Sequence, residues 1–157
     1  FMSRNEEGKK ILFLSPLTGR SVSLEEVPDP VFSQKIIGDG MAVIPSDGRI
    51  VSPVDAQVVS VADTAHAYGL KTEDGIELLI HAGIDTVKMN GEGFETFVET
   101  GAKVKKGDKL LSFDMDLVKE KGYKTQTMFL VADAKGKEVE VVEAADADNN
   151  TKIMNLK

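Results

Sequence analysis

The residues best suited to carry chemistry in this chain are its two histidines, His66 and His81, which stand fifteen residues apart. Imidazole changes its charge near neutral pH with little perturbation, and a neutral ring nitrogen can attack phosphorus and hold a phosphoryl group. A second imidazole nearby can donate a hydrogen bond to the phosphoryl oxygens. Thr64, two residues before His66, offers a hydroxyl that can select the tautomer of that ring. Two histidines are unremarkable in 157 residues, so their spacing alone equally allows two surface or structural imidazoles.

Residues 76–81 are expected to form a strand that ends at His81. Successive side chains of a strand point to opposite faces. Two isoleucines and a leucine then share one apolar face, whereas Leu79 and His81 share the other face with a glutamate. His81 is therefore expected to point away from the core, into a shallow depression of the surface. His66 also adjoins a strand-like run, so neighbouring strands can bring the two rings together.

The elements that must hold these rings in place read as many short strands. They are rich in Val, Ile and Leu, and Gly, Pro, Asp and Ser separate them at close intervals. Strands are expected at residues 11–14, 41–44, 57–61, 76–81, 110–113, 128–131 and 139–142. This pattern predicts an all-β fold, an antiparallel β-sandwich or distorted barrel with one or two very short helices. One helix is expected near residues 116–121, with Asp114 or Asp116 as its N-cap, and a second helical turn near residues 30–36.

The length and ends of the chain predict a single domain over residues 10–157. Residues 1–9 are expected to form a flexible N-terminal segment or a cloning scar, because Phe1 precedes Met2. The polar start predicts no signal peptide, and no apolar run approaches the roughly 20 residues that span a bilayer. The chain has no cysteine, which excludes disulfides, thiolate nucleophiles and cysteine-based zinc sites and is compatible with a cytoplasmic protein.

The charge of the chain bears on its partners. Its 19 basic and 26 acidic residues give a net charge of −7. Nucleic acid and anionic membranes repel such a protein, so we expect no nucleic acid partner and no direct insertion into a membrane. A basic protein partner would instead gain in encounter rate.

Several motifs together resemble one known family. The segment GLKTEDGIELLIHAGIDTV at residues 69–87 closely resembles the active-site signature of enzyme IIA of the glucose family of the bacterial phosphoenolpyruvate:sugar phosphotransferase system. The same family's further motifs are similar to TAHA at 64–67, GEGF at 91–94, SPLTG at 15–19, VPDPVF at 27–32, GDGMA at 38–42 and the segment 101–114. The resemblance covers roughly residues 11–143. Two histidine motifs in the same order, together with both flanking blocks, are a specific sign of this family.

The resemblance implies a role for each site residue. His81 matches the histidine that is phosphorylated on Nε2, and His66 matches the neighbour that stabilises the phosphoryl group. Thr64 matches the hydroxyl that orients His66. Gly83 matches the residue whose backbone carbonyl holds the other ring nitrogen of His81. Partner-binding positions are an acidic rim and an apolar surround, namely Asp29, Asp85, Val31, Phe32, Ile36, Ile37, Leu79 and Val87.

The function that the resemblance implies is that of a phosphotransferase component with a phosphohistidine intermediate. His81 would accept a phosphoryl group from the phosphocarrier protein HPr and pass it to the IIB domain of a membrane-associated sugar permease. No cofactor and no metal are required in this interpretation, and a monomer is the default expectation. The same face can also bind regulated proteins. The sugar is not legible, because this domain does not contact it.

Two other classes of protein compete with this interpretation. A zinc hydrolase would use both histidines and Asp85 as ligands, but the chain has no His-x-His or His-Glu-x-x-His motif. A lipoyl-like or biotinyl-like carrier is suggested by the turn at residues 104–110. Such a carrier needs a lysine at an exposed hairpin tip, and neither Lys88 nor Lys71 stands in a convincing version of that motif.

Overall fold

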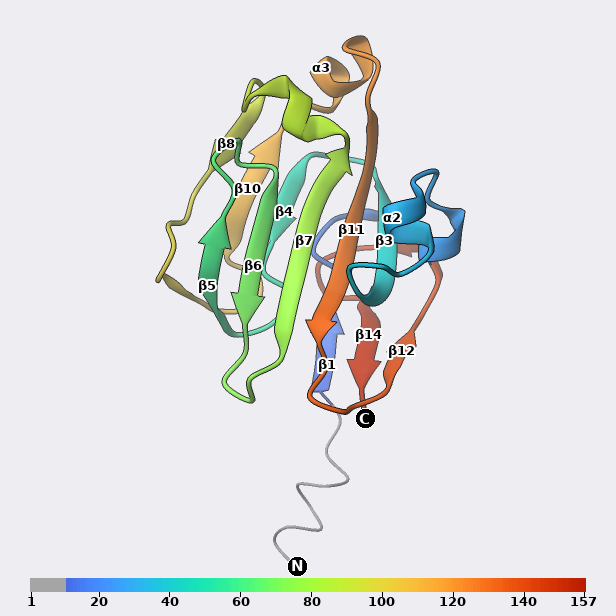
Figure 1. Cartoon of the computed structure of the whole chain (residues 1–157), viewed down its shortest axis with the longest axis vertical. Helices are drawn as coiled ribbons and strands as arrows, with labels where there is room; N and C mark the ends of the chain where they lie inside the picture. The colour runs from blue at the N-terminus through green and yellow to red at the C-terminus, as the bar shows by residue number, and fades with distance from the viewer. Residues whose placement is uncertain (1–10) are drawn as a thin grey trace, which may run out of the picture.

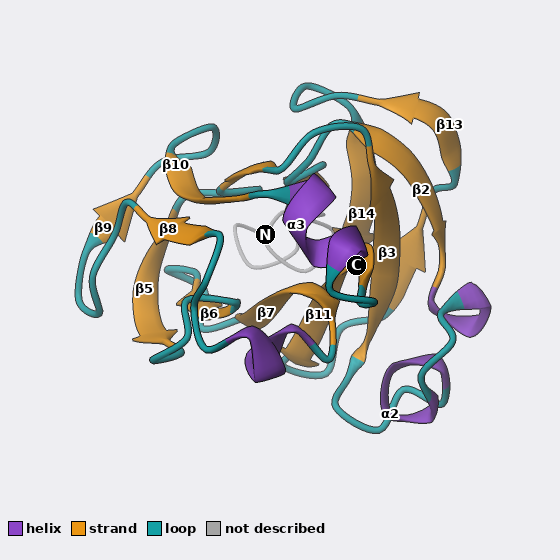
Figure 2. Ribbon diagram, turned by 90° about the horizontal axis from the view of Figure 1, so that it is seen from above, coloured by secondary structure: helices purple, strands orange, loops and turns teal. Residues whose placement is uncertain are grey.

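The computed structural model describes residues 11–157, which form three antiparallel sheets (Figure 1). The all-β class predicted from the sequence is confirmed. The segment 1–9, for which a flexible tail or a cloning scar was expected, lies outside the described residues. The largest sheet has eight strands, and the other two sheets have three strands each. Seen from above, the large sheet curves around the core, and the sheet β4-β10-β8 lies across from it (Figure 2).

The strands of the three sheets come from distant parts of the chain. The large sheet has the order β13 (Ala144–Ala147), β2 (Gly19–Ser23), β3 (Asp39–Pro45), β11 (Lys124–Asp133), β7 (Glu77–Ile84), β6 (Ala67–Lys71), β5 (Ala56–Val61) and β9 (Lys103–Val104). The second sheet has the order β4 (Arg49–Val51), β10 (Lys109–Phe113) and β8 (Phe94–Thr96). The third sheet has the order β1 (Ile11–Leu14), β14 (Lys152–Leu156) and β12 (Val139–Val141).

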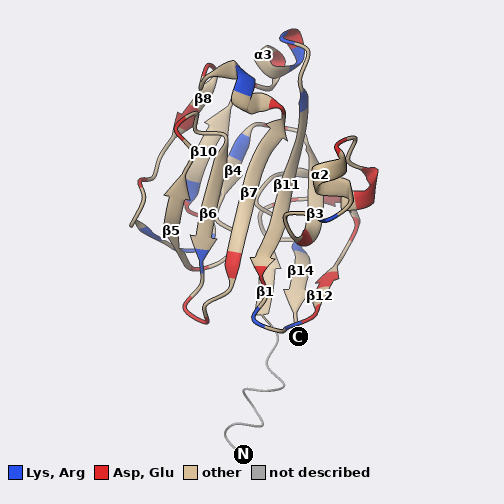
Figure 3. Cartoon of the chain, viewed as in Figure 1, with Lys and Arg blue, Asp and Glu red and all other residues tan. Residues whose placement is uncertain are grey.

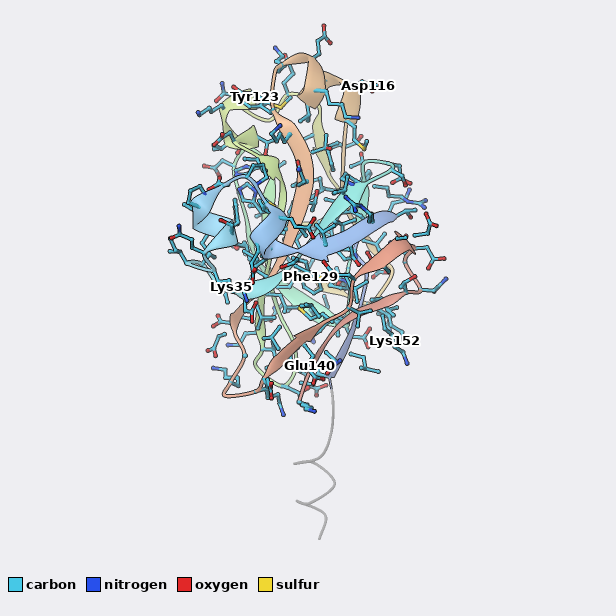
Figure 4. The ribbon with its side chains drawn as sticks, turned by 90° about the vertical axis from the view of Figure 1, so that its right-hand side faces the viewer. Lys35, Asp116, Tyr123, Phe129, Glu140 and Lys152 are labelled. Atoms are coloured by element: carbon cyan, nitrogen blue, oxygen red, sulfur yellow. The ribbon has the colours of Figure 1, made fainter. Side chains whose placement is uncertain are left out.

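One hydrophobic core lies between the three sheets. It joins Ile80 and Phe129 of the large sheet to Leu110 of the second sheet and Phe13 of the third, all of which are fully buried. Phe13 and Phe129 meet edge to face, with ring centroids 5.6 Å apart. Phe129 lies in the middle of the molecule in Figure 4. Alternation along the strands directs these side chains inward, which fixes the face that each strand shows to solvent.

The short helices begin where acidic side chains cap them. Helix α3 (Met115–Glu120) begins after Asp114, whose carboxylate accepts a hydrogen bond from the backbone N–H of Leu117 at 3.1 Å. Helix α2 (Pro30–Ser33) begins after Asp29, whose carboxylate accepts from the N–H of Val31 at 3.0 Å, with proline at the first helical position. Both predicted helices are therefore confirmed. Two 3-10 helices complete the fold, η1 (Leu24–Glu26) and η2 (Thr86–Met89).

A second, smaller apolar cluster lies on the outer face of the large sheet. There η1 and α2 cover strands β2, β3, β11 and β7, and α2 lies in front of β3 in Figure 1. Phe32 of α2 belongs to this cluster together with Ala42, Met128 and Leu130. This packing places Phe32 and its helix beside His81 of β7. None of the helices within residues 11–157 is long and apolar enough to cross a membrane.

Candidate active site

His81 lies on the outer face of β7, as the alternation of the sequence predicts. Ile76 and Ile80 are fully buried in the core and Leu78 is 2 % exposed, whereas Leu79 and His81 are half-buried on the opposite face. His81 pairs in register with Met128 of β11 and with Ala67 of β6. Its Nδ1 lies 2.8 Å from the carbonyl oxygen of Gly83. A carbonyl oxygen can only accept, so Nδ1 carries the hydrogen and the lone pair of the neutral ring is on Nε2.

Gly83 presents this carbonyl because its backbone takes a conformation that other residues avoid. Its φ is +80°, in the left-handed region. A Cβ at this position would stand 2.4 Å from Cγ2 of Thr86 and 2.9 Å from the carbonyl oxygen of Lys124. The glycine is therefore required both by the backbone conformation and by the close approach of its neighbours.

His66 meets His81 from the turn that leads into β6. The two ring centroids lie 4.9 Å apart, with the rings nearly perpendicular at 81°. The Thr64 hydroxyl lies 2.6 Å from Nδ1 of His66, and the backbone carbonyl of His66 accepts from the N–H of Ala82 at 2.7 Å. Ala65 stands in the left-handed region with φ 59°, a strained conformation for alanine. The turn therefore contains a strained residue directly before His66.

The environment of the two rings keeps both of them neutral at pH 7. Burial, and to a smaller extent the nearby His81, together lower the pKa of His66 to about 4. Burial is also the main influence on His81 and lowers its pKa, opposed by the Gly83 carbonyl and by the carboxylates of Asp29 and Asp85. Neutral imidazoles are nucleophilic at nitrogen, whereas imidazolium is not.

The remaining residues expected at the site differ in their exposure. Phe32 is 5 % exposed and its ring centroid lies 5.0 Å from that of His81, so it covers one side of the imidazole. Asp29 is half-buried. The exposed members of the predicted surround are Val31, Ile36, Ile37, Val87 and Asp85. Phe32 thus differs from its predicted neighbours, because it belongs to the outer apolar cluster rather than to the open surface.

Comparison with known proteins identifies the family. The family model described as phosphoenolpyruvate-dependent sugar phosphotransferase system, EIIA 1, matches residues 11–137. The chain belongs to this family. The glucose-specific EIIA component of Bacillus cereus is 45 % identical over 145 residues, 91 % of this chain and 88 % of that protein. The glucose-specific EIICBA component of Staphylococcus saprophyticus is 43 % identical over 141 residues, 90 % of this chain but 21 % of that protein.

A solved structure gives the same fold for an EIIA domain. Glucose permease IIA from Mycoplasma capricolum superposes with a TM-score of 0.91 at 34 % sequence identity, and the match covers 96 % of this chain and 98 % of that one. The resemblance drawn from the sequence motifs is therefore confirmed. As an EIIA component, the chain is a phosphotransferase element of a sugar phosphotransferase system.

Some contacts of this EIIA site were not assigned from the sequence. Met128, the cross-strand neighbour of His81, comes from a strand more than forty residues further along the chain, and no local pattern connects the two. Thr86 lies within the signature segment but was given no role. Of the two lysines considered for a lipoyl-like or biotinyl-like carrier, Lys88 lies in the 3-10 helix η2 and Lys71 is the last residue of β6. Within residues 11–157, no group of three or more His, Cys, Asp or Glu side chains is arranged to hold a metal ion.

The lowered pKa of His66 predicts a pH-dependent stability. Between pH 6.5 and about 4 the unfolded chain binds a proton at this histidine and the folded chain does not, so the free energy of unfolding falls as the pH falls through this window. This effect is absent above pH 6.5 and amounts to about 2–3 kcal/mol at pH 4.5. Urea unfolding of the wild type and of His66→Gln, at pH 7.5 and 4.5, isolates it. Equal losses of stability in the two proteins would contradict the assigned pKa.

Proposed function

We propose that this EIIA component is a phosphoryl carrier that accepts a phosphoryl group from phospho-HPr on Nε2 of His81 and passes it to the IIB domain of a sugar permease. The observation that carries the proposal is the contact between Nδ1 of His81 and the Gly83 carbonyl at 2.8 Å. This contact leaves Nε2 as the free nucleophile of a neutral ring. The family membership of the chain supports the proposal independently.

The transfer to His81 forms one bond to phosphorus and breaks another. The lone pair of Nε2 forms a bond to phosphorus while the bond between phosphorus and the HPr histidine breaks, and that histidine keeps the electron pair. Both nitrogens of His81 are then substituted, so the ring carries a positive charge. The Gly83 carbonyl and the carboxylates of Asp29 and Asp85 are the groups that favour positive charge at this imidazole. In the onward step a nucleophile of IIB forms a bond to phosphorus while the bond between phosphorus and Nε2 breaks, and Nε2 takes back the electron pair.

His66 supplies a donor to the phosphoryl oxygens. In the proposed state the Thr64 hydroxyl donates to Nδ1 of His66, which places the ring hydrogen on Nε2. With the two rings 4.9 Å apart, this N–H is close to where the phosphoryl group of His81 would lie. Phe32 packs on His81 and limits access of water, which would hydrolyse the phosphohistidine.

The exposed apolar rim is the proposed docking surface for HPr and IIB. Ile36 is 67 % exposed and Val87 48 %, and exposed apolar side chains that gather on one surface are typical of binding sites. Asp29 and Asp85 stand among them, and Figure 3 shows further acidic residues beside α2, at η1. This charge favours a basic partner surface. The proposal includes a monomer that acts in the cytoplasm.

Loss of one exposed side chain should weaken docking without affecting the fold. We expect Ile36→Ser to weaken HPr binding about tenfold, because an apolar anchor at the centre of an interface contributes 1 kcal/mol or more, while the unfolding temperature stays unchanged. The control is Leu12→Ser, which removes a side chain that is 42 % exposed on β1, away from the site. Titration calorimetry with HPr distinguishes the two, and equal affinities would remove Ile36 from the docking surface.

The proposed function is tested by reconstituting the relay. The protein is incubated with phosphoenolpyruvate, enzyme I and HPr, and its intact mass is measured at alkaline pH, where phosphohistidine survives. We expect a gain of one phosphoryl group that brief acid treatment removes. No gain in the presence of active phospho-HPr would overturn the proposal. Glucose is the first sugar to test in the coupled assay with a permease, because several relatives are named as glucose-specific.

A further inference from the structure

Thr86 is a buried polar residue that the proposed transfer does not use. It is 0 % exposed and is the first residue of the 3-10 helix η2, two residues after the end of β7. Its hydroxyl donates to the backbone carbonyl of Ala82, four residues earlier. A buried hydroxyl needs such a partner, because an unpaired one costs stability. The partner matters because Ala82 lies between His81 and Gly83 in the chain.

Ala82 links the two histidine segments of the site, because it directly follows His81 and is hydrogen-bonded to the backbone of His66. Its N–H donates to the backbone carbonyl of His66 at 2.7 Å, and its own carbonyl accepts from Thr86. The peptide groups on both sides of Ala82 are therefore fixed, one to the turn that carries His66 and the other to η2. The next carbonyl along the chain is that of Gly83, which accepts from Nδ1 of His81.

Thr86 also packs against Gly83 itself. A Cβ on Gly83 would stand 2.4 Å from Cγ2 and 3.3 Å from Oγ1 of Thr86, so the threonine side chain occupies the space beside the glycine Cα. The hydroxyl holds the peptide before Gly83, and the methyl group blocks rotation on the side of its Cα. With φ at +80°, a glycine left without these contacts has wide conformational freedom.

We propose that Thr86 is a positioning residue that fixes the direction of the Gly83 carbonyl and thereby the tautomer and orientation of His81. This inference deepens the proposed function, on which its kinetic consequence rests. The hydroxyl acts through two peptide groups and does not touch the reacting atoms. When it is removed, the Gly83 carbonyl turns away for part of the time, Nδ1 loses its acceptor, and a larger fraction of the rings carries the hydrogen on Nε2, where it blocks attack.

The test compares variants that separate the hydroxyl from the rest of the side chain. Thr86→Val keeps the shape and removes the donor, whereas Thr86→Ser keeps the donor. The ¹⁵N shifts of the His81 ring report its tautomer without any partner protein. We expect Thr86→Val to raise the ratio of rings with hydrogen on Nε2 to rings with hydrogen on Nδ1 about three- to tenfold, the effect of losing one hydrogen bond. Acceptance from phospho-HPr should slow in proportion to the fraction of Nδ1-protonated rings that is lost. Thr86→Ser should resemble the wild type in both measurements.

A matched control separates positioning from general loss of stability. Thr72 is 7 % exposed, and its hydroxyl accepts from the N–H of Ile76 at 3.1 Å at the opposite end of the β6–β7 hairpin. Thr72→Val also removes a buried hydroxyl and should lower stability while leaving the His81 tautomer unchanged. If Thr86→Val does not fold, the pair Thr86→Ala and Thr86→Ser, which differ by one oxygen atom, provides the same comparison.

The outcomes keep this inference distinct from the proposed function. Wild-type His81 shifts in Thr86→Val, or in Thr86→Ala against Thr86→Ser, would overturn the positioning role even if the wild type accepts a phosphoryl group. A change of tautomer in a protein whose wild type accepts nothing from phospho-HPr would support the positioning role and overturn the proposed function.

Discussion

Replacing His81 by alanine is expected to abolish phosphoryl acceptance, by more than about 10⁴-fold, because the variant has no nitrogen to attack phosphorus at this position. The remaining histidine cannot substitute for it. The Thr64 hydroxyl is hydrogen-bonded to Nδ1 of His66, and His66 is buried, with 8 % of its surface exposed. The measurement is the intact mass after incubation with phosphoenolpyruvate, enzyme I and HPr, at alkaline pH.

The variant must also be shown to be folded. His81 is half-buried on the outer face of β7, so its truncation leaves the main core intact. Unfolding by urea and binding of unphosphorylated HPr should both stay close to those of the wild type. A folded His81→Ala protein that still gains an acid-labile phosphoryl group would assign the chemistry to another residue, and His66 would be examined next.

Replacing His66 by glutamine should separate the two halves of the relay. The amide N–H of glutamine can imitate one imidazole donor, so acceptance on His81 should remain within about threefold of the wild type. Onward transfer to IIB should slow about 10²-fold, because the glutamine donor is less well oriented toward the charge that develops on the leaving phosphoryl group. Quench-flow measurement of the loss of phosphoryl group after the isolated phosphoprotein is mixed with IIB gives this rate directly.

Thr64 provides the control for this second experiment. Its hydroxyl lies 2.6 Å from Nδ1 of His66, so Thr64→Val should release the ring and slow onward transfer in the same direction, but less than His66→Gln does. An unchanged rate of onward transfer in His66→Gln would reduce His66 to a structural residue. A large loss of acceptance in the same variant would instead show that His66 is required to form the phosphohistidine.

The local features of the fold could be predicted from the sequence. The alternation in residues 76–81 identified the core face of β7 and the opposite face that carries His81, because the side-chain period of a strand is fixed at two. The sequence predicted a helix near residues 116–121 with Asp114 or Asp116 as its N-cap, because a capping carboxylate satisfies backbone donors within three residues, and the structure shows that Asp114 is the cap. Each of these signals is complete within a few residues of sequence.

Other strands carried too weak a local signal. Strand β6 (Ala67–Lys71) contains a glycine and no β-branched residue, yet it is the central link between β5 and β7. Strand β14 (Lys152–Leu156) follows the polar stretch at residues 146–150 and still pairs with β1 at the other end of the chain. Their strand conformation comes from pairing and burial in the finished sheet, which local propensity does not contain.

The same division holds at the site. The sequence by itself determined the family, the identity of the two histidines and the face on which His81 lies. Only the tertiary structure decided that Phe32 is buried against the His81 ring, that Met128 lies beside it and that Thr86 holds the peptide before Gly83. These contacts depend on the register between strands and on the path of the segment of residues 24–37, which covers the outer face of the large sheet. Both are set by the packing of the whole domain, because residues distant in sequence must bury their apolar faces together.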